Sequence, residues 1–378
     1  MVETKVFYDL LIENNIDFFT GVPDSLLKSF CAYITDNAPE NNHIIAANEG
    51  CAVGLAAGYH IATGKVPLVY MQNSGEGNVV NPLLSLTDPE VYRIPLVLVI
   101  GWRGEPGVKD EPQHKKQGRV TCSLLDAMEI PYVIMSTDEN ELKKQMQTCR
   151  ESIYEQKAPF AFVVRKDTFA AYTLKNNKVV NAPMNREEAI ECVMLNADEN
   201  AVFVSTTGMA SRELYELREK HRMKHNRDFL TVGSMGQASQ IAAAIAMNQP
   251  NRTVYCIDGD GAAIMQMGGL TTVGTCAPAN FRHILINNGA HDSVGGQPTV
   301  GLEIDLPKIA EAVGYKNVYS VSTKDELVKT LNEMKNLTGT TMLEIKTCKG
   351  ARKDLGRPKT TPLENKTALM EFMGVKGI

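Results

Sequence analysis

The sequence predicts an α/β protein built from two doubly wound parallel-sheet domains, and three observations lead to this prediction. Short apolar runs alternate with longer stretches of helical periodicity, both halves of the chain show this alternation, and a polar stretch separates them. Strands covered by helices on both faces have continuous apolar runs of this kind. A length of 378 residues suits two such domains.

The elements follow from these runs. In the first half we expect strands at 66–71, 94–100 and 160–164, and helices at 49–63 and 141–156. In the second half we expect strands at 202–205, 229–232, 253–257, 283–286 and 342–345, and helices at 237–247, 262–273 and 324–334.

The stretch 172–188 interrupts this alternation. It is rich in Lys and Asn, contains Pro183, and ends where a helix is expected to begin, at Asn185. The prediction is therefore an N-terminal domain at 1–172, a linker at 173–188 and a C-terminal domain at 189–378.

Composition and charge narrow the classes of partner and cell compartment that we expect. The net charge of −5 argues against a general nucleic-acid-binding protein, although a local cationic site for a small anion remains compatible with it. The eight cysteines form no C-x-x-C pair and are interpreted as reduced residues of a cytoplasmic protein. The N-terminus has no pattern of a signal peptide, and the apolar run 94–102 is shorter than the roughly 20 residues of a membrane span.

The strongest local signal is the run D-G-D-G-A-A at 258–263, directly after an expected strand. A second expected strand ends at N-N, 287–288. Carboxyl ends of parallel strands meet at one sheet edge, where ligands bind, and glycines let the backbone approach a phosphate closely. The Asp260 carboxylate, the Asn288 side-chain oxygen and a carbonyl near Ala290 are hard oxygen ligands that suit Mg²⁺. Each turn alone could be an ordinary tight turn; the pair predicts Mg²⁺ beside a diphosphate.

The pair G-D-G and N-N resembles the signature of the thiamine-diphosphate enzyme family. The resemblance implies thiamine diphosphate bound through Mg²⁺, with Asp260, Asn288 and the Ala290 carbonyl as metal ligands. It also implies that 1–170 binds the pyrimidine and 190–346 the diphosphate, without the middle domain that many relatives carry. Active sites of this family lie between subunits, so a homodimer or larger homo-oligomer is implied.

Other segments resemble the rest of the family's cofactor site. Glu49 opens an expected helix where relatives carry the acid that meets the pyrimidine; by itself it would be read as a charge at a helix N-terminus. Met235 would hold the cofactor bent, although simple packing is the alternative. The implied cofactor-binding residues are Glu49, Asn73, Thr207, Gly208, Gly233, Ser234, Met235, Gly259, Asp260, Gly261, Ala262 and Asn288.

Two segments of the sequence are candidates for binding the substrate. G-V-P-D-S at 21–25 follows the first expected strand. Ser25 is expected to face the reacting carbon; the alternative, which is compatible with it, is that Asp24 or Ser25 is a helix N-cap. The expected loop 102–119 contains His114 and Lys115, where some simple 2-oxo acid decarboxylases have two adjacent histidines, so plain pyruvate is disfavoured. A cation paired with a substrate charge is worth about 4 kcal/mol before desolvation, against about 1–3 kcal/mol for a methyl group. The implied substrate-binding residues are Ser25, Lys109, His114 and Lys115, with Arg103, Lys116 and Arg119 as further cations.

Two-domain relatives with G-V-P-D-S and K-D-E-P-Q-H act on 3-phosphonopyruvate. The resemblance therefore implies non-oxidative decarboxylation of this anionic 2-oxo acid to phosphonoacetaldehyde and CO₂, and fusion of the domains in one chain favours it over sulfopyruvate. The catalytic residues implied are Glu49, His114, Ser25 and His291. A solvated loop is the alternative for the 102–119 segment, and a polar loop residue for His291.

Other functions remain as alternatives. Sulfopyruvate decarboxylation, another 2-oxo acid decarboxylation or carboligation would keep the cofactor. A nicotinamide-dependent oxidoreductase would need G-x-G-x-x-G after a strand, and the sequence has no complete pattern of this kind.

Overall fold

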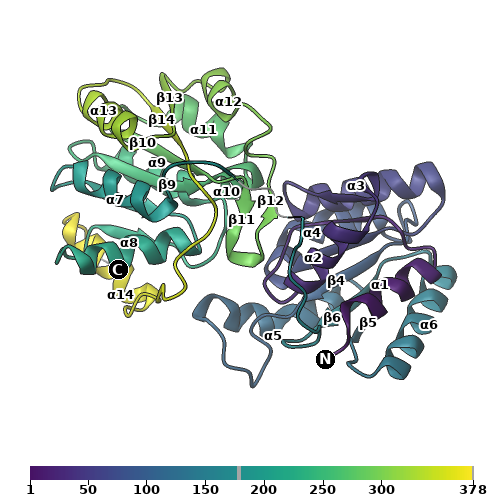
Figure 1. The fold of residues 1–378 in the computed structure, drawn as a ribbon. Helices are drawn as coiled ribbons and strands as arrows, with labels where there is room; N and C mark the ends of the chain where they lie inside the picture. Colours follow the sequence, from purple (N-terminus) through teal and green to yellow (C-terminus); the bar gives the residue numbers. More distant parts are fainter. Residues whose placement is uncertain (177–179, 377–378) are drawn as a thin grey trace. The chain divides into compact units, whose positions relative to one another are not determined.

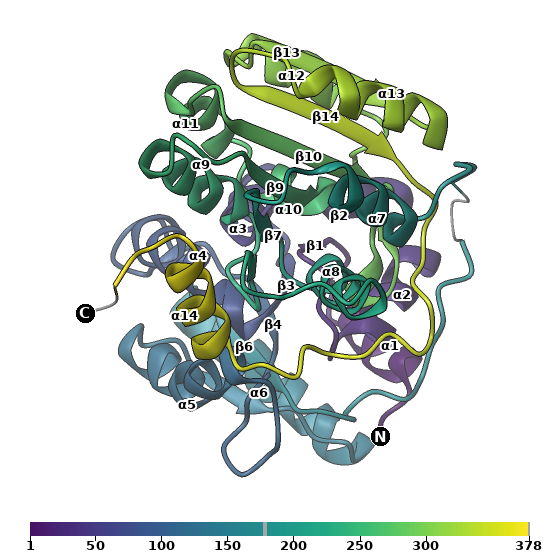
Figure 2. The same ribbon diagram turned by 90° about the vertical axis from the view of Figure 1, so that its left-hand side faces the viewer.

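The computed structural model describes residues 1–176 and 180–376. The chain divides into two compact units, one of Met1–Asn177 with Val294–Gln297 and one of Lys178–Ser293 with Pro298–Ile378. The division falls inside the expected linker, whose residues 177–179 lie outside the described part of the chain. Each unit has a sheet with its own helices (Figures 1 and 2).

Unit 1 contains a parallel sheet of six strands in the order β2-β1-β3-β4-β6-β5. One core packs α1, α2 and α6 against the sheet, and a second packs α3, α4 and α5 against the other face. The strands are β1 (Phe19–Gly21), β2 (His43–Ile45), β3 (Leu68–Gln72), β4 (Val97–Gly101), β5 (Tyr132–Ile134) and β6 (Phe160–Val164). The helices are α1 (Thr4–Glu13), α2 (Lys28–Asn37), η1 (Glu40–Asn42), α3 (Glu49–Thr63), η2 (Asn73–Gly75), α4 (Glu76–Pro82), η3 (Leu83–Thr87), α5 (Pro112–Ala127) and α6 (Glu139–Gln156).

Unit 2 repeats the architecture with the strand order β13-β14-β10-β9-β7-β8. One core involves α7, α8 and α13, and the other involves α9, α11 and α12. The strands of this sheet are β7 (Val202–Ser205), β8 (Asp228–Leu230), β9 (Val254–Gly259), β10 (Phe281–Asn287), β13 (Asn317–Val321) and β14 (Thr341–Lys346). The short strands β11 (Ala290–His291) and β12 (Gln297–Pro298) form a separate two-stranded sheet. The helices are α7 (Arg186–Asn196), α8 (Met209–Lys220), α9 (Ala238–Asn248), α10 (Asp260–Met265), α11 (Gly269–Cys276), η4 (Asp292–Val294), α12 (Leu306–Ala312), α13 (Lys324–Met334) and α14 (Pro362–Phe372).

The fold class predicted from the sequence is confirmed: two six-stranded parallel sheets, each with helices on both faces. The strands expected at 160–164 and 202–205 match β6 and β7, and the helices expected at 49–63 and 324–334 match α3 and α13. A helix begins after Asn185 as expected, because its side chain and that of Glu188 form a reciprocal capping box.

Two expectations about local structure are wrong. The helix expected at 262–273 is interrupted and forms α10 and α11, because consecutive glycines at 268 and 269 have low helix propensity. The loop expected at 102–119 is helical from Pro112 onward. Proline is favourable in the first turn of a helix, where its missing N–H needs no partner. The second half of that segment is therefore the rigid start of α5.

Among the helices of the described residues, none has the length and apolar character to cross a membrane.

Candidate active site

Two neighbouring strand ends of unit 2 bring Asp260 and Asn288 together. Strands β9 and β10 are parallel neighbours, with Gly259 opposite Ile286 in the register. Asp260 directly follows β9 and Asn288 directly follows β10. The backbone N–H of Asn288 donates a hydrogen bond to the Asp260 carboxylate. Both residues therefore lie at one edge of the sheet, as a shared metal site requires.

The Asp260 carboxylate is enclosed by backbone. Its side chain is 3% exposed, and burial raises its pKa to about 6, while hydrogen bonds from the Thr299 hydroxyl and the Gly261 N–H oppose the rise. Gly301 passes so close that an added Cβ would lie 2.6 Å from Asp260 Oδ2. Only glycine allows this approach without displacing the carboxylate.

The orientation of Asn288 is set by an ion pair. Asn288 Nδ2 donates to Asp292 Oδ2 at 2.7 Å, and Asn288 Oδ1 accepts from the Ala290 N–H at 3.1 Å. Arg186 Nη1 donates to the same Asp292 oxygen at 2.9 Å, and Arg186 is also paired with Glu213. The amide of Asn288 is thus fixed by Asp292, which Arg186 of α7 holds in turn, and the sequence pointed to neither residue.

The ends of β7 and β8 follow along the same edge, because the strand order continues β10-β9-β7-β8. The Thr206 hydroxyl is buried and has no hydrogen-bond partner within the described residues. Thr207 and Gly208 come next, and Gly208, with φ +97°, is the N-cap residue of α8. A buried unpaired hydroxyl beside the free N–H groups of a helix N-terminus suits a phosphate oxygen.

The loop after β8 contains Gly233, Ser234 and Met235. Met235 is partly buried, and Ser234 has a positive φ of 52°. At Gly236 an added Cβ would lie 2.5 Å from Gln266 Cγ, so this loop is pressed against the end of α10. The structure therefore fixes the backbone around Met235 relative to the Asp260 turn.

His291 packs against the first turn of α10. An added Cβ at Gly261 would lie 3.1 Å from His291 Cε1. Burial lowers the pKa of His291 to about 4, so its imidazole is neutral at pH 7. A neutral imidazole can donate a proton from one ring nitrogen and accept at the other.

This edge of unit 2 fits a diphosphate held through Mg²⁺. It presents a carboxylate, an amide oxygen and a backbone carbonyl, which are the hard ligands that Mg²⁺ prefers. It also presents the unpaired Thr206 hydroxyl and the N-terminus of α8. Gly259, Gly261 and Ala262 line the same turn with little or no side chain.

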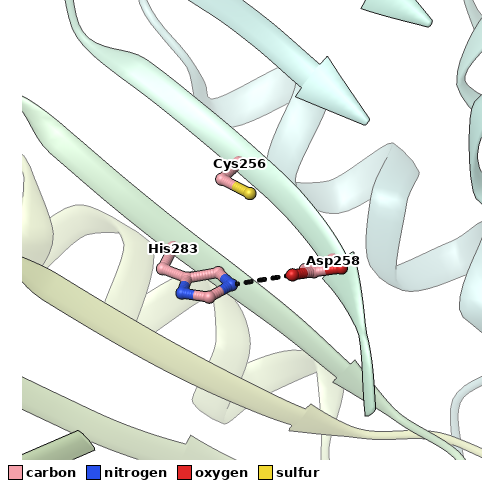
Figure 3. Close-up of side chains that lie close together, drawn as sticks. All are labelled: Cys256, Asp258 and His283. Carbon is pink, nitrogen blue, oxygen red and sulfur yellow. Dashed lines mark hydrogen bonds and ion pairs between the residues drawn. The ribbon is translucent and has the colours of Figure 1, made fainter. Parts of the chain in front are cut away.

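A cluster of polar side chains lies inside the sheet next to this edge (Figure 3). His283 Nε2 lies 3.4 Å from Asp258 Oδ2, His283 Nδ1 lies 2.9 Å from the Tyr315 hydroxyl, and Cys256 is on the same face of β9. The ligand atoms of Cys256, Asp258 and His283 lie within 4.8 Å of one another, and all three residues are buried. Asp258 Oδ1 also accepts from the N–H of Gly259 at 3.0 Å. These bonds connect β9 to β10 behind the Asp260 turn.

Glu49 is buried at the start of α3. Its side chain is 5% exposed, and Asn78 Nδ2 donates to its Oε2 at 2.7 Å. Gly75 lies against the other oxygen so closely that a Cβ there would overlap Glu49 Oε1. Glu49 is therefore an acid in the first turn of α3, as its place in the sequence suggested, but its carboxylate is buried.

In the segment after β1, the side chains of Asp24 and Ser25 have different hydrogen-bond partners. Asp24 is fully buried and accepts from Gln72 Nε2 at 2.5 Å and from the Leu26 N–H at 2.8 Å. Ser25 is not the N-cap of α2, whose N-cap residue is Leu27. Instead the Ser25 hydroxyl accepts from Arg103 Nη1 at 2.8 Å. The N-cap alternative for Ser25 is therefore wrong.

Arg103 is the cation that the structure brings to Ser25. Asp110 holds its guanidinium from two sides, with Nε to Oδ2 at 2.8 Å and Nη2 to Oδ1 at 2.5 Å. Lys109 and Lys115, which the sequence suggested for the substrate anion, have exposed side chains. His114 lies within the electrostatic influence of Arg103, and burial together with that charge lowers its pKa to about 4.

Asn73 supports this arrangement. It is fully buried, its Nδ2 donates to the Arg103 carbonyl at 2.8 Å and to Thr121 Oγ1 at 2.9 Å, and its Oδ1 accepts from the Arg103 N–H at 3.2 Å. Gly104 and Gly118 touch backbone to backbone, and neither leaves space for a Cβ. Asn73 therefore holds the segment that carries Arg103.

Both halves of the chain match known domains. The N-terminal TPP binding domain of thiamine pyrophosphate enzymes matches residues 1–130, and the C-terminal TPP binding domain matches residues 206–345. The chain is 36% identical to a phosphonopyruvate decarboxylase of Streptomyces viridochromogenes, over 91% of this chain and 88% of that protein. It is 35% identical to a phosphonopyruvate decarboxylase of Streptomyces hygroscopicus, over 93% and 89%.

A sulfopyruvate decarboxylase of Methanosarcina acetivorans is 26% identical over 91% of this chain and 90% of that protein. This relative corrects one inference from the sequence. It also matches along nearly its whole length, so fusion of the two domains does not distinguish phosphonopyruvate from sulfopyruvate. With both cofactor-binding domains matched and full-length relatives above one third identity, the chain belongs to the thiamine pyrophosphate enzymes, in the branch that contains decarboxylases.

Proposed function

We propose that the protein decarboxylates 3-phosphonopyruvate to phosphonoacetaldehyde and CO₂, with thiamine diphosphate bound through Mg²⁺. The observation that carries the cofactor part is the contact between Asp260 and Asn288 at one sheet edge. The substrate part is supported by 35–36% identity to phosphonopyruvate decarboxylases, against 26% to a sulfopyruvate decarboxylase.

In this proposal the metal ligands are Asp260, Asn288 and the Ala290 carbonyl. Arg186 and Asp292 keep the Asn288 amide oriented, as second-sphere groups do at metal sites. The diphosphate is held by Thr207, Gly208 and the N–H groups of the α8 N-terminus.

Thiamine diphosphate, when bound, supplies the sink for the electron pair that remains when CO₂ leaves. Glu49 holds a proton at the pyrimidine ring nitrogen, and its inward-facing carboxyl suits this role. Neutral His114 and His291 move the proton that replaces CO₂, and Ser25 orients the substrate. Met235 shapes the cofactor conformation.

We also propose that the protein works as a homodimer or larger homo-oligomer. The helix α3 buries Glu49 on one side and exposes Cys51, Gly54, Leu55 and Gly58 on the other. An added Cβ at Gly54 or Gly58 would meet nothing within 4 Å, so a second helix could approach this side closely. A Leu55→Arg variant that sediments as a monomer, while the wild type sediments as a larger species, is the expected result.

The function is tested with purified protein, thiamine diphosphate and Mg²⁺. CO₂ and aldehyde are followed with 3-phosphonopyruvate, sulfopyruvate and pyruvate in parallel. We expect the highest kcat/KM with 3-phosphonopyruvate, a loss of at least about 100-fold in Glu49→Gln, and unchanged activity in Glu155→Gln, which alters an exposed acid. A higher kcat/KM with sulfopyruvate would reassign the substrate, and full activity of Glu49→Gln would remove the role of that acid.

A further inference from the structure

We propose that Arg103 binds the phosphonate group of the substrate and that Asp110 is the positioning residue that makes this possible. This inference rests on the proposed function, because it names the cation that selects the substrate of that same site. The sequence pointed to Lys109 and Lys115 instead, and the structure leaves both of these side chains exposed.

The first argument is that Arg103 is held in place before any ligand binds. Asp110 accepts from two of its nitrogens, and the carboxylate of Asp110 is itself fixed by the N–H groups of Gly104 at 2.8 Å and Glu111 at 2.7 Å. Asn73 holds the Arg103 backbone on both its N–H and its carbonyl. A guanidinium that folding has already ordered loses little further freedom when an anion binds.

The second argument is that the guanidinium still has donors to offer. In the described part of the chain, Asp110 and Ser25 use three of its five N–H bonds. Its side chain is 18% exposed, so the residue is not fully enclosed. The two remaining N–H groups are on Nη1, which also donates to the Ser25 hydroxyl, and on Nη2, and this combination matches the several oxygens of a phosphonate.

The third argument concerns which end of the substrate the cation binds. The carboxylate loses its charge as CO₂ leaves, so a fixed cation on it would stabilise the substrate more than the transition state and would slow the reaction. The phosphonate keeps its charge from substrate to product. A cation there lowers KM and leaves the chemical barrier unchanged. An arginine fixed at the site is therefore productive only at the phosphonate.

Position supports the same assignment. Arg103 follows β4, Ser25 follows β1, and Asn73 follows β3, three strands that are neighbours in the order β1-β3-β4. Ligands of parallel sheets bind at such strand ends. The Arg103 charge also reaches His114, whose pKa it helps to lower.

The test uses full-length protein with cofactor and Mg²⁺. Arg103→Gln is compared with Lys109→Gln and Lys115→Gln for 3-phosphonopyruvate and for pyruvate. We expect KM for 3-phosphonopyruvate to rise about 30-fold or more in Arg103→Gln, with kcat within about threefold of wild type. For pyruvate, the kcat/KM of Arg103→Gln should stay within about threefold of wild type. Both lysine variants should keep their kcat/KM within about threefold of wild type for either substrate.

A second readout does not depend on turnover. Calorimetry measures binding of 3-phosphonopropionate, which has the phosphonate but lacks the 2-oxo group. Because Arg103→Gln leaves the Asp110 carboxylate unpaired, the double variant Arg103→Gln/Asp110→Asn, which keeps the net charge, is measured beside it. Both should bind the analogue about 30-fold or more weakly than wild type.

The outcomes separate this inference from the proposed function. Analogue binding that stays intact in both Arg103 variants overturns the role of Arg103, and so does a fall in kcat at constant KM. Loss of binding in Lys109→Gln or Lys115→Gln would move the anion site to that lysine. If wild type releases no CO₂ from 3-phosphonopyruvate but binds the analogue through Arg103, the proposed function fails and the anion site stands.

Discussion

Glu76 allows a quantitative test of the structure that does not depend on the cofactor. It begins α4, its side chain is 2% exposed, and its Oε1 has no hydrogen-bond partner among the described residues. Burial raises its pKa to about 8, and a hydrogen bond with Thr121 opposes part of the rise. At neutral pH the folded protein therefore holds Glu76 in its protonated form.

The sign and size of the effect follow from this pKa. An acid with a higher pKa in the folded state binds more protons when folded, so stability falls as pH rises from the ordinary value of 4.5 to about 8. Each pH unit in that range costs about 1.4 kcal/mol, on the order of 5 kcal/mol in all. Glu76→Gln removes this titration, so its stability relative to wild type should increase over the same range and level off above about pH 8.

Urea unfolding between about pH 5 and pH 10 measures this difference. Trp102 is the single tryptophan of the chain and lies in unit 1, where its indole donates to the Gly118 carbonyl, so its fluorescence reports the unit that contains Glu76. Glu155→Gln, at an exposed position of α6, should give a flat difference curve. A flat curve for Glu76→Gln as well would refute the burial of an unpaired acid.

Two further predictions concern packing and charge. Gly75→Ala places a methyl group on the Glu49 carboxylate and should reduce CO₂ release at least about tenfold and stability by about 1–3 kcal/mol. Gly77→Ala, which faces open space, should change neither quantity, and equal activity of the two variants would contradict the contact between Gly75 and Glu49. Arg218→Met leaves Asp228 charged and fully buried, and it should lower the free energy of unfolding, measured by thermal unfolding, by about 3–5 kcal/mol. The double variant Arg218→Met/Asp228→Leu should restore most of this loss, and an equal loss in it would show that the charge left behind is not the cause.

The sequence predicted the parts of the site that depend on strand ends. Asp260 and Asn288 could be paired because each directly follows a continuous apolar run, and parallel strands bring such positions to one edge. The same reasoning placed Glu49 at the start of α3, since small residues with helical spacing follow it. In these cases local pattern and tertiary position are linked by the regular geometry of strands and helices.

The sequence did not predict the parts that depend on loop conformation. The segment 102–119 contains five lysines and arginines, and the sequence favoured Lys109 and Lys115 for the substrate anion. Only the fold shows that Asp110 accepts hydrogen bonds from the Arg103 guanidinium. Asp110 lies seven residues away, and this spacing has no fixed geometry outside a helix or strand. The proline at 112 was a usable signal for the start of α5. A helix predicted to begin at Pro112 would have separated the helical residues 112–119 from the loop residues before them.

The Arg103 cluster has a consequence for how the protein can change over time. Arg103, Asp110, Ser25 and Asn73 belong to unit 1, and the Asp260 turn belongs to unit 2, whose hydrophobic core is separate. Mutations that replace Arg103, proposed to bind the anion, and Asp110, proposed to position it, can therefore accumulate without disturbing the residues proposed to hold the metal. New acids of different charge could be adopted through a few substitutions near the end of β4, with the rest of the chain preserved.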